Sequence, residues 1–136
     1  MTSPIQELLQ GRQVWIPVAG RSMAPVLTPG DEALVAPLRS WPPPTGSIVL
    51  LVNATGRFVL HRVCAHDWFW CTTHGLANAL PDPPVRRSSV IGVALRRRRG
   101  TSGQGVRLLH ISTPAAGVIG WAVRSARWLR ARLPRR

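Results

Sequence analysis

Short runs of mainly apolar residues, separated by turn-forming residues, occupy most of the first 95 positions of the chain. Runs of this length, bounded by Gly, Pro, Asn or Asp, are typical of β-strands. Several lie only a few residues apart, as in hairpins, and residues 66–67 are predicted to form a two-residue turn. The pattern therefore predicts a mainly β fold, a meander of hairpins with strands at residues 14–18, 33–36, 47–52, 57–65, 68–73 and 89–95.

Two segments have apolar residues at helical rather than strand spacing. A short N-terminal helix is predicted at residues 4–10, with Ser3 as its N-cap. Residues 117–133 predict a basic amphipathic helix, in which tryptophans lie on one flank and arginines lie towards the other. The polar residues 96–105 predict a linker between the last strand and this C-terminal helix.

Basic charge is concentrated in the last part of the chain. The 136 residues include 18 basic and 5 acidic side chains, which give a net charge of +13. All 18 basic residues are arginines, and eleven of them lie in residues 96–136, which contain no carboxylate. The length predicts one core, and a hydrophobic content of 45% excludes a disordered polycation. We therefore expect a nearly neutral domain at residues 1–95, followed by an arginine-rich linker and helix at 96–136.

The arginine-rich end has three interpretations: a solvated tail, a segment that docks on an anionic membrane, or a segment that binds nucleic acid. No base-reading motif accompanies the arginines at positions 96–99, whereas Trp121 and Trp128 accompany those of the predicted helix. We therefore expect peripheral contact with an anionic membrane in preference to nucleic acid.

Candidate chemistry begins with Ser22, which lies in a turn at residues 20–25 directly after the first predicted strand. Such a turn can present a hydroxyl and aim backbone N–H groups at one point. His61 follows in a mostly apolar strand, and Asp82 lies beyond the glycine-containing loop that starts at residues 73–78. A serine hydroxyl needs a base within hydrogen-bond reach, and the chain has no lysine to serve as one. An imidazole accepts a proton near neutral pH, so one of the four histidines can serve as the base.

Residues 13–95 resemble the signal-peptidase superfamily of serine proteases. The resemblance is closest to the endoplasmic-reticulum and archaeal-type branch, in which the strand motif reads His-Arg-Val, as it does at residues 61–63. It implies a signal-peptidase-like fold of β-hairpins or β-ribbons, with the serine nucleophile after the first strand. It also implies that a peptide or preprotein substrate binds in extended form as an added strand.

The resemblance implies a role for each of three residues. Ser22 is expected to be the nucleophile, and its backbone N–H is expected to contribute to the oxyanion hole. His61 is expected to be the general base, and Asp82 is expected to orient its imidazole and stabilise the imidazolium. The implied function is a serine endopeptidase that cleaves a leader or pro-segment from a precursor through an acyl-enzyme.

Two departures from the family pattern support an alternative. His74 and Leu76 stand where the family usually has lysine and aspartate, and Gly20 stands where some relatives have a hydroxyl that contributes to the oxyanion hole. The alternative is a non-catalytic module of the same fold, whose basic tail binds an anionic membrane or nucleic acid.

The sequence predicts neither a cofactor nor a metal ion. Cys64, His66, Cys71 and His74 are potential zinc ligands, but their spacing matches no standard zinc module. Two cysteines do not make a disulfide framework. Neither a secretory signal nor a run of 18 apolar residues is present in the sequence, so we expect a cytoplasmic protein with peripheral membrane contact.

Overall fold

The computed structural model describes residues 3–108, and within them the expected mainly β fold is confirmed. The elements, in chain order, are α1 (Pro4–Leu9), β1 (Val14–Pro17), β2 (Asp31–Pro37), β3 (Ile48–Val52), β4 (Phe58–His66), β5 (Trp70–His74), β6 (Val85–Arg86), the 3-10 helix η1 (Arg87–Ser89), β7 (Val90–Arg99) and β8 (Val106–Arg107). The helix expected at residues 117–133 lies outside the described residues.

The short helix α1 begins as its sequence indicates. The Ser3 hydroxyl accepts a hydrogen bond from the Gln6 backbone N–H, and the Gln6 side chain accepts one from the Ser3 N–H. This reciprocal pair is a capping box, which satisfies two backbone donors at the start of the helix. Within residues 3–108, no helix has the length and apolar composition needed to cross a bilayer.

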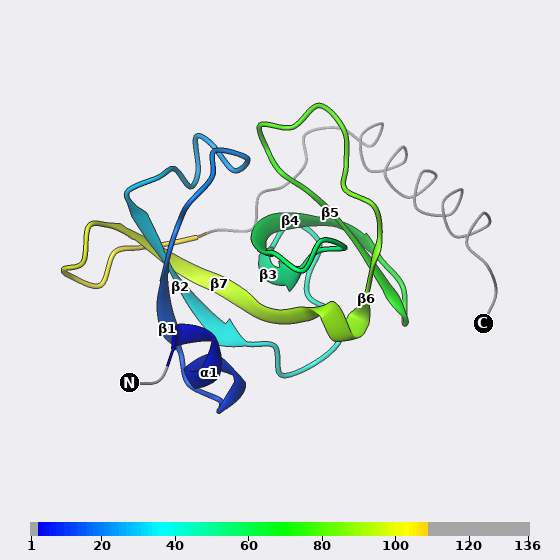
Figure 1. Ribbon diagram of the computed structural model, residues 1–136, viewed down its shortest axis with the longest axis horizontal. Coiled ribbons are helices and arrows are strands. Elements are labelled where there is room, and N and C mark those ends of the chain that lie inside the picture. Colours follow the sequence, from blue (N-terminus) through cyan, green and yellow to red (C-terminus); the bar gives the residue numbers. More distant parts are fainter. Residues whose placement is uncertain (1–2, 109–136) are drawn as a thin grey trace.

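The strands form one antiparallel sheet in the order β1-β2-β7-β3-β4-β5-β6, with β8 paired to β7 (Figure 1). The consecutive strands β3, β4 and β5 are the hairpin meander that the sequence predicts. The last long strand, β7, departs from a simple meander because it returns between β2 and β3. The sheet curls strongly, so that β3 and β4 lie deep in the molecule (Figure 1).

Both faces of β3 are buried, which explains its uninterrupted apolar sequence. Leu50 joins one core cluster with Leu8 of α1 and Val35 of β2. Its neighbours Val49 and Leu51 join a second cluster on the other side of the strand. Successive side chains of a strand point to opposite faces, so a central strand covered on both sides needs apolar residues at every position.

The arginines at positions 96–99 belong to the sheet. Strand β7 continues through Arg99, and these four residues pair with β2. The linker expected at residues 96–105 is therefore wrong for its first four residues, and the chain does not leave the sheet at residue 95. Arg98 binds Glu32 (Nε to Oε1, 2.9 Å) and stacks 4.0 Å from the Trp15 ring centroid. These cross-strand contacts allow a strand of arginines to form in the sheet.

We predict that Gly92→Ala destabilises the fold. A Cβ at Gly92 of β7 would lie 2.6 Å from Val35 Cγ1 and 2.9 Å from the Ala36 carbonyl oxygen, so the sheet must shift to admit it. We expect a loss of about 1–3 kcal/mol in the free energy of unfolding, measured by urea denaturation. Gly20→Ala is the matched control, because no atom lies within 4 Å of the Cβ that it adds. Equal stability of the two variants would contradict the packing described here.

Candidate active site

Ser22 lies in the loop between β1 and β2 and is half-buried. The loop is fixed on the C-terminal side of Ser22 by two apolar side chains, Met23 and Leu27, which are 2% and 0% exposed. The N–H groups of Val26 and Leu27 both donate to the Met23 carbonyl, at 2.9 and 3.0 Å. The serine is therefore held directly beside two anchored core residues.

Two arginines of β7 hold the far end of this loop. Arg97 Nη1 donates to the Val26 carbonyl at 2.7 Å, and Arg99 Nη2 donates to the Thr28 hydroxyl at 3.0 Å. Arg99 also pairs with Asp31 at 3.1 Å, and Asp31 accepts a hydrogen bond from the Thr28 N–H. The arginine run of β7 thus fixes the segment that presents Ser22.

His61 occupies the middle of β4, where it pairs with Val49 of β3, and it is 7% exposed. Its Nε2 atom lies 2.9 Å from Ser22 Oγ. Its other ring nitrogen, Nδ1, contacts the Asp82 carboxylate. Because a carboxylate accepts hydrogen bonds, Nδ1 carries the proton and Nε2 is left to accept the serine hydroxyl.

Asp82 is placed by Thr73, near the end of β5. The Asp82 N–H donates to the Thr73 carbonyl at 2.8 Å, and the Thr73 hydroxyl donates to Asp82 Oδ2 at 2.8 Å. The same oxygen, Oδ2, contacts His61 Nδ1. Thr73 is 1% exposed, so its hydroxyl has a fixed environment and holds the carboxylate in one orientation.

The loop after β5 closes over the serine. The Ala77 N–H donates to the Ser22 carbonyl at 2.9 Å. A Cβ at Gly75 would lie 2.9 Å from that same carbonyl oxygen and 3.1 Å from His61 Nε2. Glycine is therefore required at position 75, since only the absence of a side chain lets this loop approach both catalytic candidates.

The two departures in this loop have structural explanations. Leu76, at the position where the resemblance leads us to expect a carboxylate, packs against the core cluster that contains Met23 and Leu27. His74, at the position where the resemblance leads us to expect lysine, donates from Nε2 to the Asn78 carbonyl at 2.7 Å. An apolar contact and a local hydrogen bond thus order the loop here.

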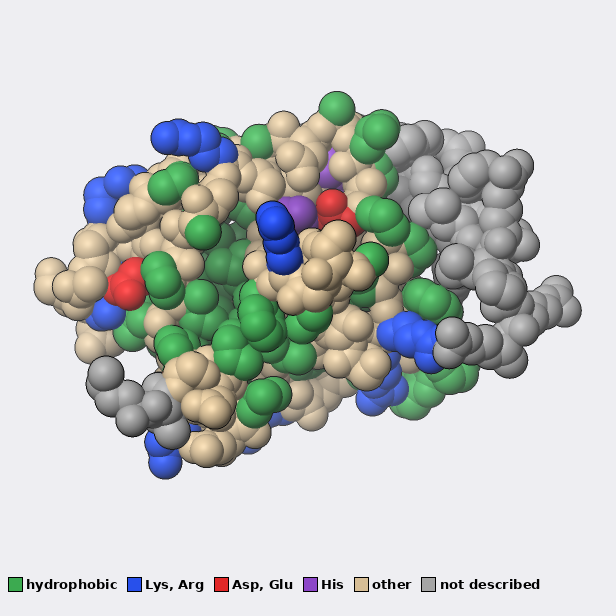
Figure 2. All heavy atoms as spheres, in the orientation of Figure 1, with side chains coloured by type: hydrophobic (Ala, Val, Ile, Leu, Met, Phe, Trp, Pro, Cys, Tyr) green, Lys and Arg blue, Asp and Glu red, His purple; other side chains and the backbone are tan. Residues whose placement is uncertain are grey.

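The structure brings together all three residues that the sequence singles out. Ser22 comes from the loop before β2, His61 from β4 and Asp82 from the loop before β6, and they form one continuous chain of contacts. On the face shown in Figure 2, histidine and acidic side chains lie side by side at the surface. Such a chain can deprotonate a serine hydroxyl as it attacks a carbonyl carbon.

The backbone amide of Ser22 is a candidate for a second role. Among residues 3–108, it has no hydrogen-bond acceptor, while the Ser22 carbonyl and hydroxyl are both engaged. An N–H group beside a nucleophile can stabilise the oxyanion that forms on attack. The role expected for this amide stays a prediction.

Thr73 and Gly75 are the site residues that sequence reasoning did not assign. Both lie in the loop segment singled out at residues 73–78, but their partners are distant in sequence. Thr73 pairs with Val63, which lies two positions after His61 and therefore on the same face of β4. The turn expected at residues 66–67 would instead pair Thr73 with Leu60, and the observed register also shifts between Val63 and Ala65. No signal in the sequence therefore placed Thr73 beside the histidine.

The cysteines are not candidate nucleophiles. Cys64 and Cys71 are free and buried. Burial raises the pKa of the Cys64 thiol, and it raises the pKa of Cys71 to about 12. A thiol with such a pKa stays protonated near neutral pH and does not attack. Within the described part of the chain, no group of three or more His, Cys, Asp or Glu side chains could hold a metal ion.

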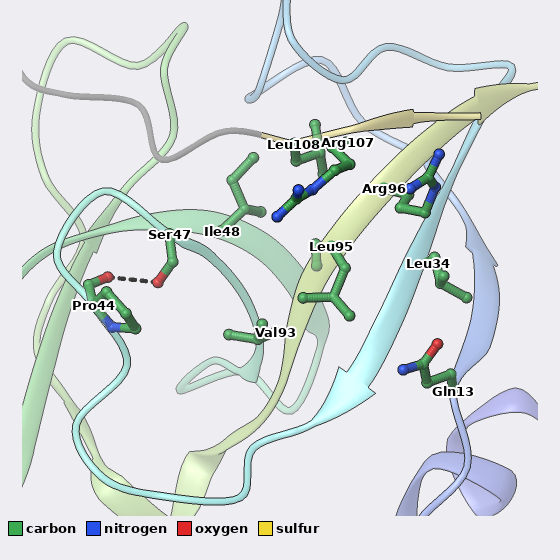
Figure 3. Close-up of a pocket in the computed structure, with 11 residues that line it drawn as sticks. Gln13, Leu34, Pro44, Ser47, Ile48, Val93, Leu95, Arg96, Arg107 and Leu108 are labelled. Atoms are coloured by element: carbon green, nitrogen blue, oxygen red, sulfur yellow. Dashed lines mark hydrogen bonds between the residues drawn. The ribbon is translucent and has the colours of Figure 1, made fainter. Parts of the chain in front are cut away.

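A cavity of about 370 Å³ opens elsewhere on the sheet, beside β7 (Figure 3). Its walls come from β2, β3, β7, β8 and the loop before β3, and none of the three candidate catalytic residues lines it. Apolar side chains such as Leu34, Val93 and Leu95 form much of the lining, with Arg96 and Arg107 beside them. The candidate chemistry and this hollow are therefore separate features.

Comparison with known proteins gives no match to a family model, to a curated protein or to a solved structure.

We predict that Thr73→Val slows acylation of Ser22 by a fluorophosphonate about tenfold, because a hydrogen bond to a charged group is worth about 1.5–3 kcal/mol. The Thr73→Ser variant keeps the hydroxyl and should react at nearly the wild-type rate. The second-order rate constant of adduct formation, followed by intact-mass spectrometry, gives the comparison. Thermal unfolding of both variants separates a loss of positioning from a loss of folding. A wild-type rate for Thr73→Val would show that the threonine does not position Asp82.

Proposed function

We propose that the protein is a serine endopeptidase that cleaves a leader or pro-segment from a peptide or protein precursor. The observation that carries the proposal is the contact chain from Ser22 Oγ through the His61 imidazole to the Asp82 carboxylate. The resemblance to the Ser-His branch of the signal-peptidase superfamily supports the same reaction and the same three residues. The substrate is proposed to bind as an extended strand.

The mechanism follows from the protonation states that the contacts favour. Ser22 Oγ attacks the scissile carbonyl while His61 Nε2 takes the hydroxyl proton, and the amide of Ser22 stabilises the oxyanion. His61 then gives that proton to the leaving amine, which leaves an acyl-enzyme on Ser22. A water molecule, deprotonated by the same Nε2, attacks the ester; the new carboxyl end is released as His61 returns the proton to Ser22 Oγ. Asp82 holds the ring in place and stabilises the imidazolium.

A purely structural role explains the arrangement less well. A buried histidine needs only one acceptor and one donor, which neighbouring backbone groups commonly supply. Here both ring nitrogens instead contact side chains from separate loops. The Ser22 loop and the Gly75 loop are each fixed by further contacts that bring them to the imidazole. The non-catalytic alternative does not require these two loops to meet at the imidazole.

The cleavage itself can be tested without knowing the substrate. Cell lysate or a library of precursor-derived peptides is incubated with the wild-type protein or with Ser22→Ala, and new amino termini are identified by mass spectrometry. We expect termini that form only with the wild-type protein and share a residue preference around the cut. Ser22 is half-buried in a loop, and the change to alanine removes a single hydroxyl, so it should leave the melting temperature within a few degrees. Identical sets of termini for the two proteins would contradict the proposal.

We further predict that Gly20→Ser raises the rate of peptide cleavage. Some relatives have a hydroxyl two residues before the nucleophile, and the Cβ at Gly20 would meet no atom within 4 Å, so there is room for the side chain. Because one oxyanion donor is worth about a hundredfold in rate, we expect an increase in kcat of about tenfold or more. Gly20→Ala is the control without the hydroxyl. An equal effect of serine and alanine would show that the added hydroxyl does not reach the oxyanion.

A further inference from the structure

The turn between β4 and β5 exposes two large aromatic side chains at its tip. Strand β4 ends at His66 and β5 begins at Trp70, so the expected two-residue turn at 66–67 is wrong and residues 67–69 form the tip. Trp68 is 63% exposed and Phe69 is 68% exposed. Neither side chain contributes to the two core clusters.

The tip is rigidly built, so the exposure of these aromatics is a fixed feature of the fold. Asp67 Oδ1 accepts hydrogen bonds from the N–H groups of Phe69 and Trp70, at 2.9 and 2.8 Å. The Asp67 carbonyl accepts one from Trp41 Nε1 at 2.8 Å, and the Phe69 carbonyl accepts one from the Arg87 N–H at 2.8 Å. The backbone of the tip is thus tied both to itself and to the segments beside it.

Two arginines flank these aromatic rings. The Arg87 guanidinium lies 4.6 Å from the Trp68 ring centroid and 5.4 Å from that of Trp41, and the Arg86 guanidinium lies 5.8 Å from that of Trp70. Both arginines are exposed at the surface. Asp67, the carboxylate of the tip, accepts hydrogen bonds from backbone N–H groups, and its single negative charge is outnumbered by the two guanidinium groups. The exposed face therefore combines apolar rings with net positive charge.

The size of this surface decides what kind of partner fits it. Two aromatic side chains exposed to about two thirds present roughly 250–300 Å² of apolar surface. A stable protein partner covers about 800 Å² on each side, which is well beyond this tip. A membrane interface is suited to such a small protrusion, because aromatic rings enter between the headgroups while guanidinium groups bind the lipid phosphates.

We propose that the aromatic tip, defined here as Trp68, Phe69, Arg86 and Arg87, docks the folded domain on an anionic membrane surface. All four residues of this site lie within the described part of the chain, in a different stretch of the sequence from residues 109–136. Docking does not depend on the peptidase activity. Thr73 of β5 lies four residues after Phe69, a span of about 13 Å in extended chain, so a docked tip would hold Ser22, His61 and Asp82 close to the headgroups.

The test uses the full chain and vesicle flotation. Vesicles of phosphatidylcholine, with and without phosphatidylserine, are mixed with the wild-type protein, with the double variant Trp68→Ser/Phe69→Ser, and with Phe58→Ser as a matched control. Phe58 is 50% exposed but lies at the opposite end of β4 from the tip. We expect the double variant to bind phosphatidylserine vesicles about tenfold more weakly, and the control to bind as the wild type does.

A second readout locates the contact. Brominated lipids quench the fluorescence of tryptophans that enter the bilayer, and we expect Trp68→Phe to show clearly less quenching than the wild-type protein. Arg86→Ser/Arg87→Ser should weaken binding to phosphatidylserine vesicles and leave the small binding to pure phosphatidylcholine unchanged.

Three outcomes would overturn the proposal: wild-type affinity of the double variant, quenching that is unchanged in Trp68→Phe, or no binding of the wild-type protein to either vesicle. The first two would assign membrane binding to another part of the chain, and the third would favour a protein partner for the tip. Ser22→Ala should bind vesicles as the wild type does. A failure of the peptidase proposal is therefore distinguishable from a failure of this one.

Discussion

The contact between His61 Nδ1 and the Asp82 carboxylate is the interaction on which the rest of the site depends. It fixes the ring orientation and the tautomer, so that Nε2 faces Ser22 as an acceptor. It also ties the loop after β5 to the centre of the sheet, and that loop in turn binds the Ser22 carbonyl. Replacing the carboxylate would therefore disturb the base, the loop and the nucleophile together.

The curled sheet makes this contact possible by holding segments that are far apart in sequence. Strand β4 carries the histidine, β5 leads into the Asp82 loop, and β7 fixes the Ser22 loop through Arg97 and Arg99. The arginines of β7 are therefore part of the scaffold of the site. Their charge is balanced in part by Asp31 and Glu32 of β2, which lie opposite them in the sheet.

Local patterns predicted the helix α1 and the strands β1 to β5, because capping residues and apolar runs act over a few positions. The order of motifs also singled out Ser22, His61 and Asp82 before any geometry was known. The same patterns did not predict the place of β7 between β2 and β3, the four arginines within β7, or the roles of Thr73 and Gly75. Each of these features depends on contacts between segments that are distant in sequence. The run of four arginines, for example, has the polar composition of a linker, but pairing with β2, a salt bridge and stacking on Trp15 hold it in a strand.

The central claim is that His61 activates Ser22 for attack, and peptide mapping after treatment with a fluorophosphonate tests it most directly. Wild-type protein and His61→Gln are treated in parallel, digested and analysed by mass spectrometry, which reports the modified residue. We predict one adduct, on Ser22 in the wild-type protein, and none on Ser22 in the variant. An unmodified Ser22 in the folded wild-type protein, or equal modification in His61→Gln, would contradict it.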